Sequence, residues 1–238
     1  MSSDLDKSQS TTILLPEDAT ESKYKLKILN SSLNLLVHML IGVIVGVTVL
    51  LVFSYGVPPS WGMLHMLLCV IGYQLLMAEG ILSLCPDNGW SSFMTLRDKK
   101  RAHWILQVLG SALAIIGTVM EITQKKVHFK SLHAQFGLVA MIFTILSLIN
   151  GLTSLYTYEL RKFISPRLSK ITHSVFGSIA FLTSSISLCY AFNMRWFRNW
   201  VALDELAVTL IVFTALLTFI VMVNPFVVLY VKYFPKKK

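Results

Sequence analysis

Four histidines occupy matching positions in four apolar segments of the chain. Each falls between the second and the fifth residue of its segment, and the four are His65, His103, His133 and His173. Neighbouring segments would cross a membrane in opposite directions, so equal depth from the start places alternate histidines at opposite faces. The spacings agree, since 68 residues separate His65 from His133 and 70 separate His103 from His173. The sequence therefore predicts two histidine pairs, one near each face.

Paired histidines on facing helices can hold a metal cofactor in the interior of a helical bundle. A zinc site usually takes four protein ligands, or three and a water molecule, whereas each level here offers two. Haem brings four nitrogens of its own and needs only one or two axial ligands from the protein. The ligand count therefore favours haem. With both axial positions filled, the iron keeps no open position for oxygen, so its task would be to carry electrons.

A glycine follows each of these histidines by four or seven residues, on the same helical stripe. The four glycines are Gly72, Gly110, Gly137 and Gly177. Because glycine has no side chain, it leaves room for a flat ring to lie against the helix backbone. We therefore expect all four to pack against the cofactor.

The elements that must position these residues are membrane-spanning helices. Of 238 residues, 55% are hydrophobic and only 14% are charged, and the apolar runs are long enough to cross a hydrocarbon core about 30 Å thick. Backbone groups in lipid must pair within their own segment, which requires helices. The predicted spans are 33–54, 61–84, 102–123, 132–156, 171–194 and 205–231. The expected fold class is all-α: an integral membrane six-transmembrane-helix bundle with a four-helix haem-binding core. A water-soluble enzyme is excluded.

The basic residues indicate the orientation of the bundle. Fifteen lysines and arginines flank one side of the predicted spans and five flank the other, and the richer side normally faces the cytosol. Both termini are therefore predicted to be cytosolic. We expect a disordered cytosolic tail over residues 1–32, the transmembrane domain over 33–231 and a basic cytosolic tail over 232–238. The net charge of +9 thus reflects orientation in the lipid bilayer, and no nucleic-acid partner is expected.

Two further ionisable residues, Glu79 and His128, have positions that suggest a function. Glu79 lies about 21 Å beyond His65 along the same predicted helix, and intramembrane carboxylates are usually functional. It could take up a proton as a donor loses its electron, or bond to a neighbouring helix. His128 precedes His133 by five residues in a loop and could place or deprotonate an acceptor, or be simply a solvated loop histidine. We expect His38, early in the first span, to be a hydrogen-bonded residue on an outer helix.

Four short segments resemble the cytochrome b561 family, and the resemblance covers nearly all of the chain from about residue 33. The segments are Ser60–His65, Arg101–Trp104, Ser131–Gly137 and Lys170–His173. The run Leu76–Leu82 is also similar to one subgroup of that family. The resemblance implies two haem b cofactors. One would lie between His65 and His133 on the non-cytosolic side, and the other between His103 and His173 on the cytosolic side.

The resemblance also implies an enzyme, a transmembrane ascorbate-dependent reductase of an endomembrane such as the endoplasmic reticulum, a vesicle or a lysosome. It would oxidise cytosolic ascorbate and deliver one electron to monodehydroascorbate radical or Fe³⁺ on the far side, working as a homodimer. Family positions that bind ascorbate correspond here to Arg97, Arg101 and Arg167, and guanidinium pairs well with a planar anion. Lys130 would serve the acceptor side. The loop before the third helix departs from the family, because it lacks the apolar motif with tyrosine and arginine that is tied to ascorbate.

Two other hypotheses remain open from the sequence. One is a channel or transporter without redox activity, in which the histidines and Glu79 form a proton or metal pathway. Such a pathway should place polar side chains through the middle of the membrane, where the sequence has few. The other is a haem-binding partner or regulator without turnover.

Overall fold

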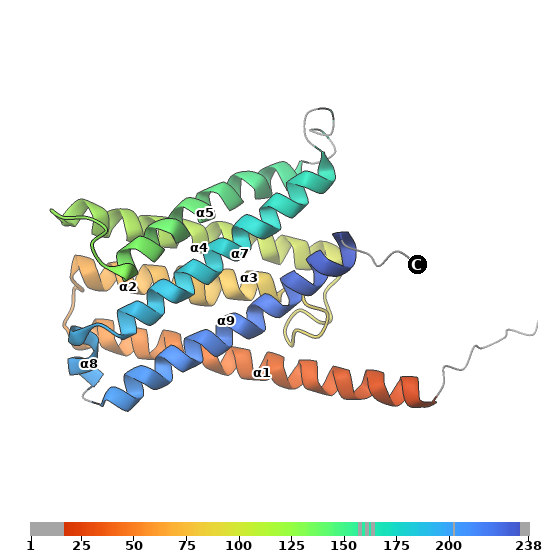
Figure 1. The fold of residues 1–238 in the computed structure, drawn as a ribbon, viewed down its shortest axis with the longest axis horizontal. Coiled ribbons are helices and arrows are strands. Elements are labelled where there is room, and N and C mark those ends of the chain that lie inside the picture. The colour runs from red at the N-terminus through yellow and green to blue at the C-terminus, as the bar shows by residue number, and fades with distance from the viewer. Residues whose placement is uncertain (1–16, 157–158, 160–161, 163–164, 202, 234–238) are drawn as a thin grey trace, which may run out of the picture.

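The computed structural model describes residues 17–156, 159, 162, 165–201 and 203–233. Long helices lie side by side, and consecutive ones run in opposite directions (Figure 1). In chain order the elements are α1 (Glu17–Ser54), α2 (Trp61–Val70), the π-helix η1 (Ile71–Met77), α3 (Ala78–Leu82), α4 (Leu96–Gln124), α5 (Leu132–Leu155), α7 (Pro166–Phe192), α8 (Arg195–Val201) and α9 (Asp204–Tyr233).

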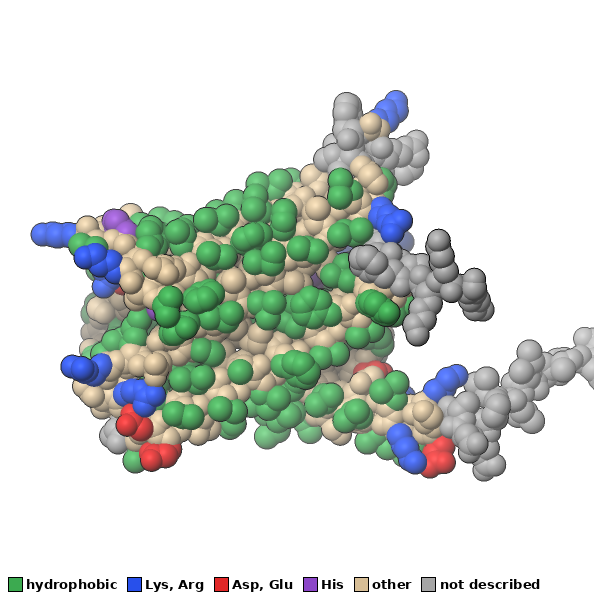
Figure 2. All heavy atoms as spheres, in the orientation of Figure 1, with side chains coloured by type: hydrophobic (Ala, Val, Ile, Leu, Met, Phe, Trp, Pro, Cys, Tyr) green, Lys and Arg blue, Asp and Glu red, His purple; other side chains and the backbone are tan. Residues whose placement is uncertain are grey.

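Six segments within the described residues are long and apolar enough to cross a membrane. Five of them are α1, α4, α5, α7 and α9, and the sixth is formed by α2, η1 and α3 in continuous succession. Lysine and arginine side chains gather at the two ends of the molecule, with hydrophobic side chains over the helices between them (Figure 2). The predicted all-α membrane bundle of six helices is confirmed.

Several helices begin before the apolar run that predicted them. The helix α1 starts at Glu17, so residues 17–32, expected as part of a disordered tail, are helical. Residues 21–32 are exposed, and an ion pair of 2.6 Å joins Glu21 to Lys25 one turn later. Likewise α4 starts at Leu96 because Thr95 caps it, and α7 starts with Pro166, a residue favoured in the first turn. Hydropathy locates the segment in lipid, whereas capping and charge pairs decide where each helix begins.

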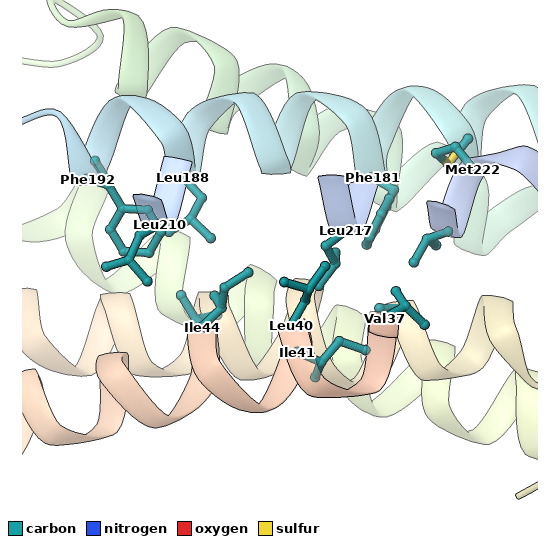
Figure 3. Packing of buried hydrophobic residues seen from close by; sticks show 14 of the residues in the cluster. Val37, Leu40, Ile41, Ile44, Phe181, Leu188, Phe192, Leu210, Leu217 and Met222 are labelled. Atoms are coloured by element: carbon teal, nitrogen blue, oxygen red, sulfur yellow. The ribbon is translucent and has the colours of Figure 1, made fainter. Parts of the chain in front are cut away.

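The main apolar core lies between α1, α7 and α9 (Figure 3). Its labelled members are Val37, Leu40, Ile41 and Ile44 from α1, Phe181, Leu188 and Phe192 from α7, and Leu210, Leu217 and Met222 from α9. This core fixes α7 against the two outer helices. The four histidines thus belong to helices that pack on one another beside this core.

Backbones meet directly where η1 packs against α4. A Cβ atom at Gly72 would lie 2.6 Å from the Gly110 carbonyl oxygen, and one at Gly110 would lie 2.7 Å from the Gly72 carbonyl oxygen. Such distances leave no space for a side chain on either helix. The two glycines therefore set how closely the second and third spans approach.

Buried polar side chains cross-link the middle of the bundle. The Tyr73 hydroxyl lies 3.1 Å from the Thr144 hydroxyl, and the Gln74 amide nitrogen donates to the Ser185 hydroxyl at 3.2 Å. Both Tyr73 and Gln74 belong to η1, and π-helical turns often accompany functional sites. The sequence had indicated few polar groups at this depth, and Tyr73 and Gln74 use theirs to join η1 to α5 and α7 through hydrogen bonds.

Candidate functional site

The first histidine pair lies between α2 and α5. His65 and His133 have ring centroids 6.1 Å apart and ring planes at 80°. Both helices begin at a serine cap just before the histidine, Ser60 for α2 and Ser131 for α5. The caps fix where each helix starts, and hence how deep each histidine sits. The structure brings together the two residues that their depth predicted to be partners.

The second pair has nearly the same geometry and lies between α4 and α7. His103 and His173 have ring centroids 6.1 Å apart and ring planes at 90°. The Gly117 carbonyl of α4 contacts His65, so Gly117 marks the level of the first pair on this helix. It follows His103, a member of the second pair, by fourteen residues. At about 1.5 Å per residue the two levels are about 21 Å apart. The pairs therefore lie near opposite ends of the bundle.

Each of the four rings is oriented by a backbone carbonyl of the neighbouring antiparallel helix. The Nδ1 atoms of His65, His103, His133 and His173 lie 2.9, 2.8, 2.9 and 3.0 Å from the carbonyl oxygens of Gly117, Gly80, Ser187 and Ser147. A carbonyl oxygen can only accept, so Nδ1 carries the proton and Nε2 keeps its lone pair. Histidines that bind metals normally show this arrangement.

The hydrogen bonds are reciprocal within each helix pair. His65 bonds to α4, while His103 of α4 bonds back to Gly80 at the end of the second span. The pair formed by α5 and α7 repeats the pattern. Each antiparallel pair thus supplies one histidine to each level, which explains the almost equal spacings of 68 and 70 residues in the sequence.

The geometry fits a metal held between two imidazoles. Metal–nitrogen bonds of about 2.0–2.1 Å to both Nε2 atoms would place the ring centroids about 6 Å apart, as observed in both pairs. A cavity of about 490 Å³ adjoins His65 and His133, a size typical of ligand sites. Among the described residues no three or more His, Cys, Asp or Glu gather as metal ligands. Two imidazoles at each level fit haem, which needs only one or two ligands from the protein.

The four predicted glycines lie in contacts between helices. A Cβ at Gly137 would lie 3.4 Å from the Ser187 hydroxyl, and one at Gly177 would lie 3.2 Å from the Ser147 hydroxyl. Those serines supply the carbonyls that hold His133 and His173, so the two glycines make room for them. Gly72 and Gly110 form the backbone contact described above. Packing of these four residues against a cofactor stays a prediction.

Glu79 and His38 contact each other at the His103 end. The Nδ1 atom of His38 lies 2.7 Å from Glu79 Oε1, and the indole N–H of Trp90 donates to Glu79 Oε2 at 2.7 Å. The structure thus places His38 in hydrogen bonds on the outer helix α1, as expected, and gives Glu79 a partner on that helix. Asn88, which contacts His38 Nε2 at 3.0 Å, had no signal in the sequence because only the fold brings its loop to α1.

The predicted arginines stand where the helices bearing His103 and His173 begin. Arg97 and Arg101 belong to the first two turns of α4, and Arg167 is the second residue of α7. Both α4 arginines are exposed, and Arg101 pairs with Asp98 at 3.3 Å. Sequence reasoning missed Lys99, which is buried and donates to the Cys85 carbonyl at 3.1 Å. In a run of charged residues nothing marks one lysine as buried.

Basic residues also line the mouth of the cavity beside His65 and His133. Lys125, His128 and Lys130 line it together with Glu121, which pairs with Lys125 at 3.1 Å. Between them Phe129 adopts a positive φ of 56°, a conformation uncommon for an aromatic residue. The structure therefore brings His128 and Lys130 to one opening, next to the first histidine pair.

Two facing histidine pairs, anchored at Nδ1 inside a six-helix membrane bundle, define a class of integral membrane protein suited to bind haem. A family model described as eukaryotic cytochrome b561 matches residues 64–198. Because this match covers more than half of the chain, the chain belongs to the cytochrome b561 family. Membership of this family implies binding of haem b, and the residues described above fit that cofactor.

Curated relatives point in the same direction. The chain is 29% identical over 142 residues to the proteins named Transmembrane reductase CYB561D2 of Mus musculus and Homo sapiens, and 28% identical to that of Bos taurus. Each alignment covers 58% of this chain and 62% of the relative, so the chain spans less than two thirds of the relatives it matches. No solved structure matches the chain.

Proposed function

We propose that this protein is a transmembrane reductase that carries single electrons across a membrane through two haem b groups. The observation that carries the proposal is the pair of histidine sites at opposite ends of one bundle, each with ring centroids 6.1 Å apart. His65 and His133 would ligate the non-cytosolic haem, and His103 and His173 the cytosolic one. When bound between these imidazoles, haem would supply one-electron redox chemistry.

The protein's own contribution is to orient the ligands and to exclude water. The four Nδ1–carbonyl bonds fix the tautomer and the plane of each imidazole. Substrates would then meet the protein at its two ends. At the middle of the bundle Tyr73 and Gln74, which also line the cavity beside His65 and His133, are held by hydrogen bonds to α5 and α7.

The proposed electron donor is cytosolic ascorbate, bound near the start of α4 and α7. Ascorbate is a monoanion at neutral pH, and Arg97, Arg101 and Arg167 would pair with its oxygens. The proposed acceptor is monodehydroascorbate radical or Fe³⁺ at the opposite mouth, where Lys130 and His128 lie. Glu79 on the donor side and His128 on the acceptor side are proposed to couple proton transfer to these steps.

We also propose in which membrane the protein lies, how it is oriented there and how it assembles. The domain over residues 33–231 would span an endomembrane, of the endoplasmic reticulum, a vesicle or a lysosome, with the tails 1–32 and 232–238 in the cytosol and with a homodimer as the assembly. Residues 1–16 and 234–238 lie outside the described residues. The excess of basic residues on the side of both termini supports this orientation.

Replacing Arg101 by glutamine should raise the KM for ascorbate about tenfold and leave kcat nearly unchanged. One charge-assisted hydrogen bond to an anion contributes about 1.5–3 kcal/mol, and only binding of the donor is affected. Initial rates of haem reduction against ascorbate concentration measure this effect. Lys126→Gln, an exposed residue of the opposite loop, serves as the control. An unchanged KM in Arg101→Gln would remove this arginine from the donor site.

Purified protein in detergent should contain about two b-type haems per chain, and ascorbate should reduce them. The visible spectrum before and after addition of ascorbate, with a haem assay per chain, measures both quantities. In vesicles loaded with ferric ion, external ascorbate should then reduce the internal iron. Absence of a Soret band from folded protein reconstituted with haem would overturn the proposal. The histidines and Glu79 would then be assigned to the proton or metal pathway of a channel or transporter.

A further inference from the structure

A hydrogen-bonded cluster at the His103 end joins α1, α3 and the segment between α3 and α4. At its centre His38 Nδ1 contacts Glu79 Oε1 at 2.7 Å, and Trp90 donates to Glu79 Oε2 at 2.7 Å. The side chains of His38 and Glu79 are 27% and 17% exposed. The cluster lies outside the two histidine pairs, yet α3 also carries Gly80, whose carbonyl holds His103.

Neighbouring hydrogen bonds fix the proton on Nε2 of His38. The Ser91 hydroxyl donates its one proton to the Ser83 carbonyl at 3.0 Å, so it must accept from the Asn88 amide nitrogen at 2.7 Å. That orientation turns the oxygen of Asn88 toward His38 Nε2, at 3.0 Å. Because this oxygen can only accept, His38 Nε2 carries a proton.

The hydrogen bonds of Asn34 independently give the same orientation of the Asn88 side chain. The backbone N–H of Gly89 donates to Asn34 Oδ1 at 2.8 Å, so the Asn34 amide nitrogen faces Asn88 and donates to its oxygen at 2.9 Å. With Nε2 protonated, the short contact between His38 Nδ1 and Glu79 Oε1 contains one proton. The pair therefore carries no net charge, which suits a partly buried site better than a lone carboxylate would.

The His38–Glu79 pair is linked to His103 through a single peptide group. Glu79 immediately precedes Gly80, and the Gly80 carbonyl accepts the Nδ1–H of His103 at 2.8 Å. The same carbonyl accepts the Ser83 hydroxyl at 2.7 Å, and the Ser83 carbonyl is held by Ser91. Fixing the last turn of α3 thus fixes the direction of the oxygen that orients His103.

We propose that His38 and Glu79 are positioning residues for His103, acting through the Gly80 carbonyl. This inference rests on the proposed function, since it concerns the haem that His103 would ligate. The partner of a ligating imidazole's second nitrogen sets the plane and basicity of that imidazole, and its loss typically lowers metal affinity 10–100-fold. Helix α1, which supplies none of the four ligands, would therefore tune one redox centre and leave the other unchanged.

Two substitutions of Glu79 separate hydrogen bonding from simple packing. Glu79→Leu removes both hydrogen bonds at similar volume. Glu79→Gln can keep both, because its oxygen can accept from Trp90 while its nitrogen donates to His38 Nδ1. The Gly80 carbonyl remains in Glu79→Leu protein and only its direction is released, so we expect binding of the His103–His173 haem to weaken by up to about 10-fold, the low end of the range for loss of a direct partner. The midpoint potential of this haem should rise because His103 becomes a poorer electron donor, and its low-spin electron paramagnetic resonance signal should change. Glu79→Gln should restore all three properties.

The experiment uses the full chain loaded with haem, and Glu21→Gln on the exposed part of α1 is the matched control. His38→Phe removes the same contact by changing the residue on α1, and it must affect the same centre. This variant keeps the proposal testable if Glu79→Leu protein does not fold. In His103→Ala protein only the His65–His133 centre would remain. Removing the His38–Glu79 contact in that protein should leave the haem affinity and the midpoint potential of this centre unchanged. Equal effects on both centres, or none on either, would overturn the proposal. A wild-type protein without haem would instead overturn the proposed function.

Discussion

His65→Ala protein should hold about one haem per chain, and the haem that remains should be the one between His103 and His173. His65 and His133 would hold the haem at their level together, so removal of one imidazole would leave a single protein ligand there and should abolish that site. The second site is about 21 Å away along α4. Its histidines are oriented by the carbonyls of Gly80 and Ser147, which His65 does not touch, so this site should keep its ligands. His173→Ala should give the reverse result, losing the haem between His103 and His173.

Haem content per chain and redox titration of each variant measure this selectivity. The two centres should titrate separately in wild-type protein, and each variant should lack a different one. Lys126→Ala is the control, because it removes an exposed loop side chain that lies outside both pairs and outside the residues that line the cavity. If His65→Ala and His173→Ala each lost both haems while remaining folded, the assignment of two independent levels would be wrong.

Gly72→Ala should be among the most destabilising small substitutions in the chain. The new methyl group would lie 2.6 Å from the Gly110 carbonyl oxygen and 3.0 Å from the Ala114 backbone nitrogen, and backbone atoms cannot move aside as a flexible side chain can. Overpacking typically costs about 1–3 kcal/mol, and we expect the upper part of that range. Because the second span and α4 contribute to both levels, separation of these helices should weaken both haem sites together.

Thermal or detergent-induced unfolding, followed by haem absorbance and helical circular dichroism, measures this effect. Gly46→Ala is the matched control, since nothing lies within 4 Å of the added atom, and it should be neutral or stabilising by up to about 1 kcal/mol because alanine favours a helix more than glycine does. A Gly72→Ala protein as stable as Gly46→Ala would show that the contact between η1 and α4 can relax. The pattern also differs from His65→Ala, which should affect one centre only.

The sequence by itself determined the class of fold and the pairing of the histidines. Apolar length forces each span to be a helix in lipid, and alternating direction forces histidines of equal depth into two levels. These inferences needed only the position of each residue along its own helix. That is why His65 could be assigned to His133, and His103 to His173, before any contact was known.

Only the tertiary structure decided which atoms meet across helices. The sequence did not indicate that Gly80, Gly117, Ser147 and Ser187 would offer the carbonyls for Nδ1, because any residue has a carbonyl and its direction depends on helix rotation. Nor did it indicate the partner of Glu79, since His38 lies 41 residues away on a helix outside the four that carry the pairs. Depth along a helix can be read from the chain, whereas rotation about its axis and the path of a connecting loop are set by packing against every neighbour at once.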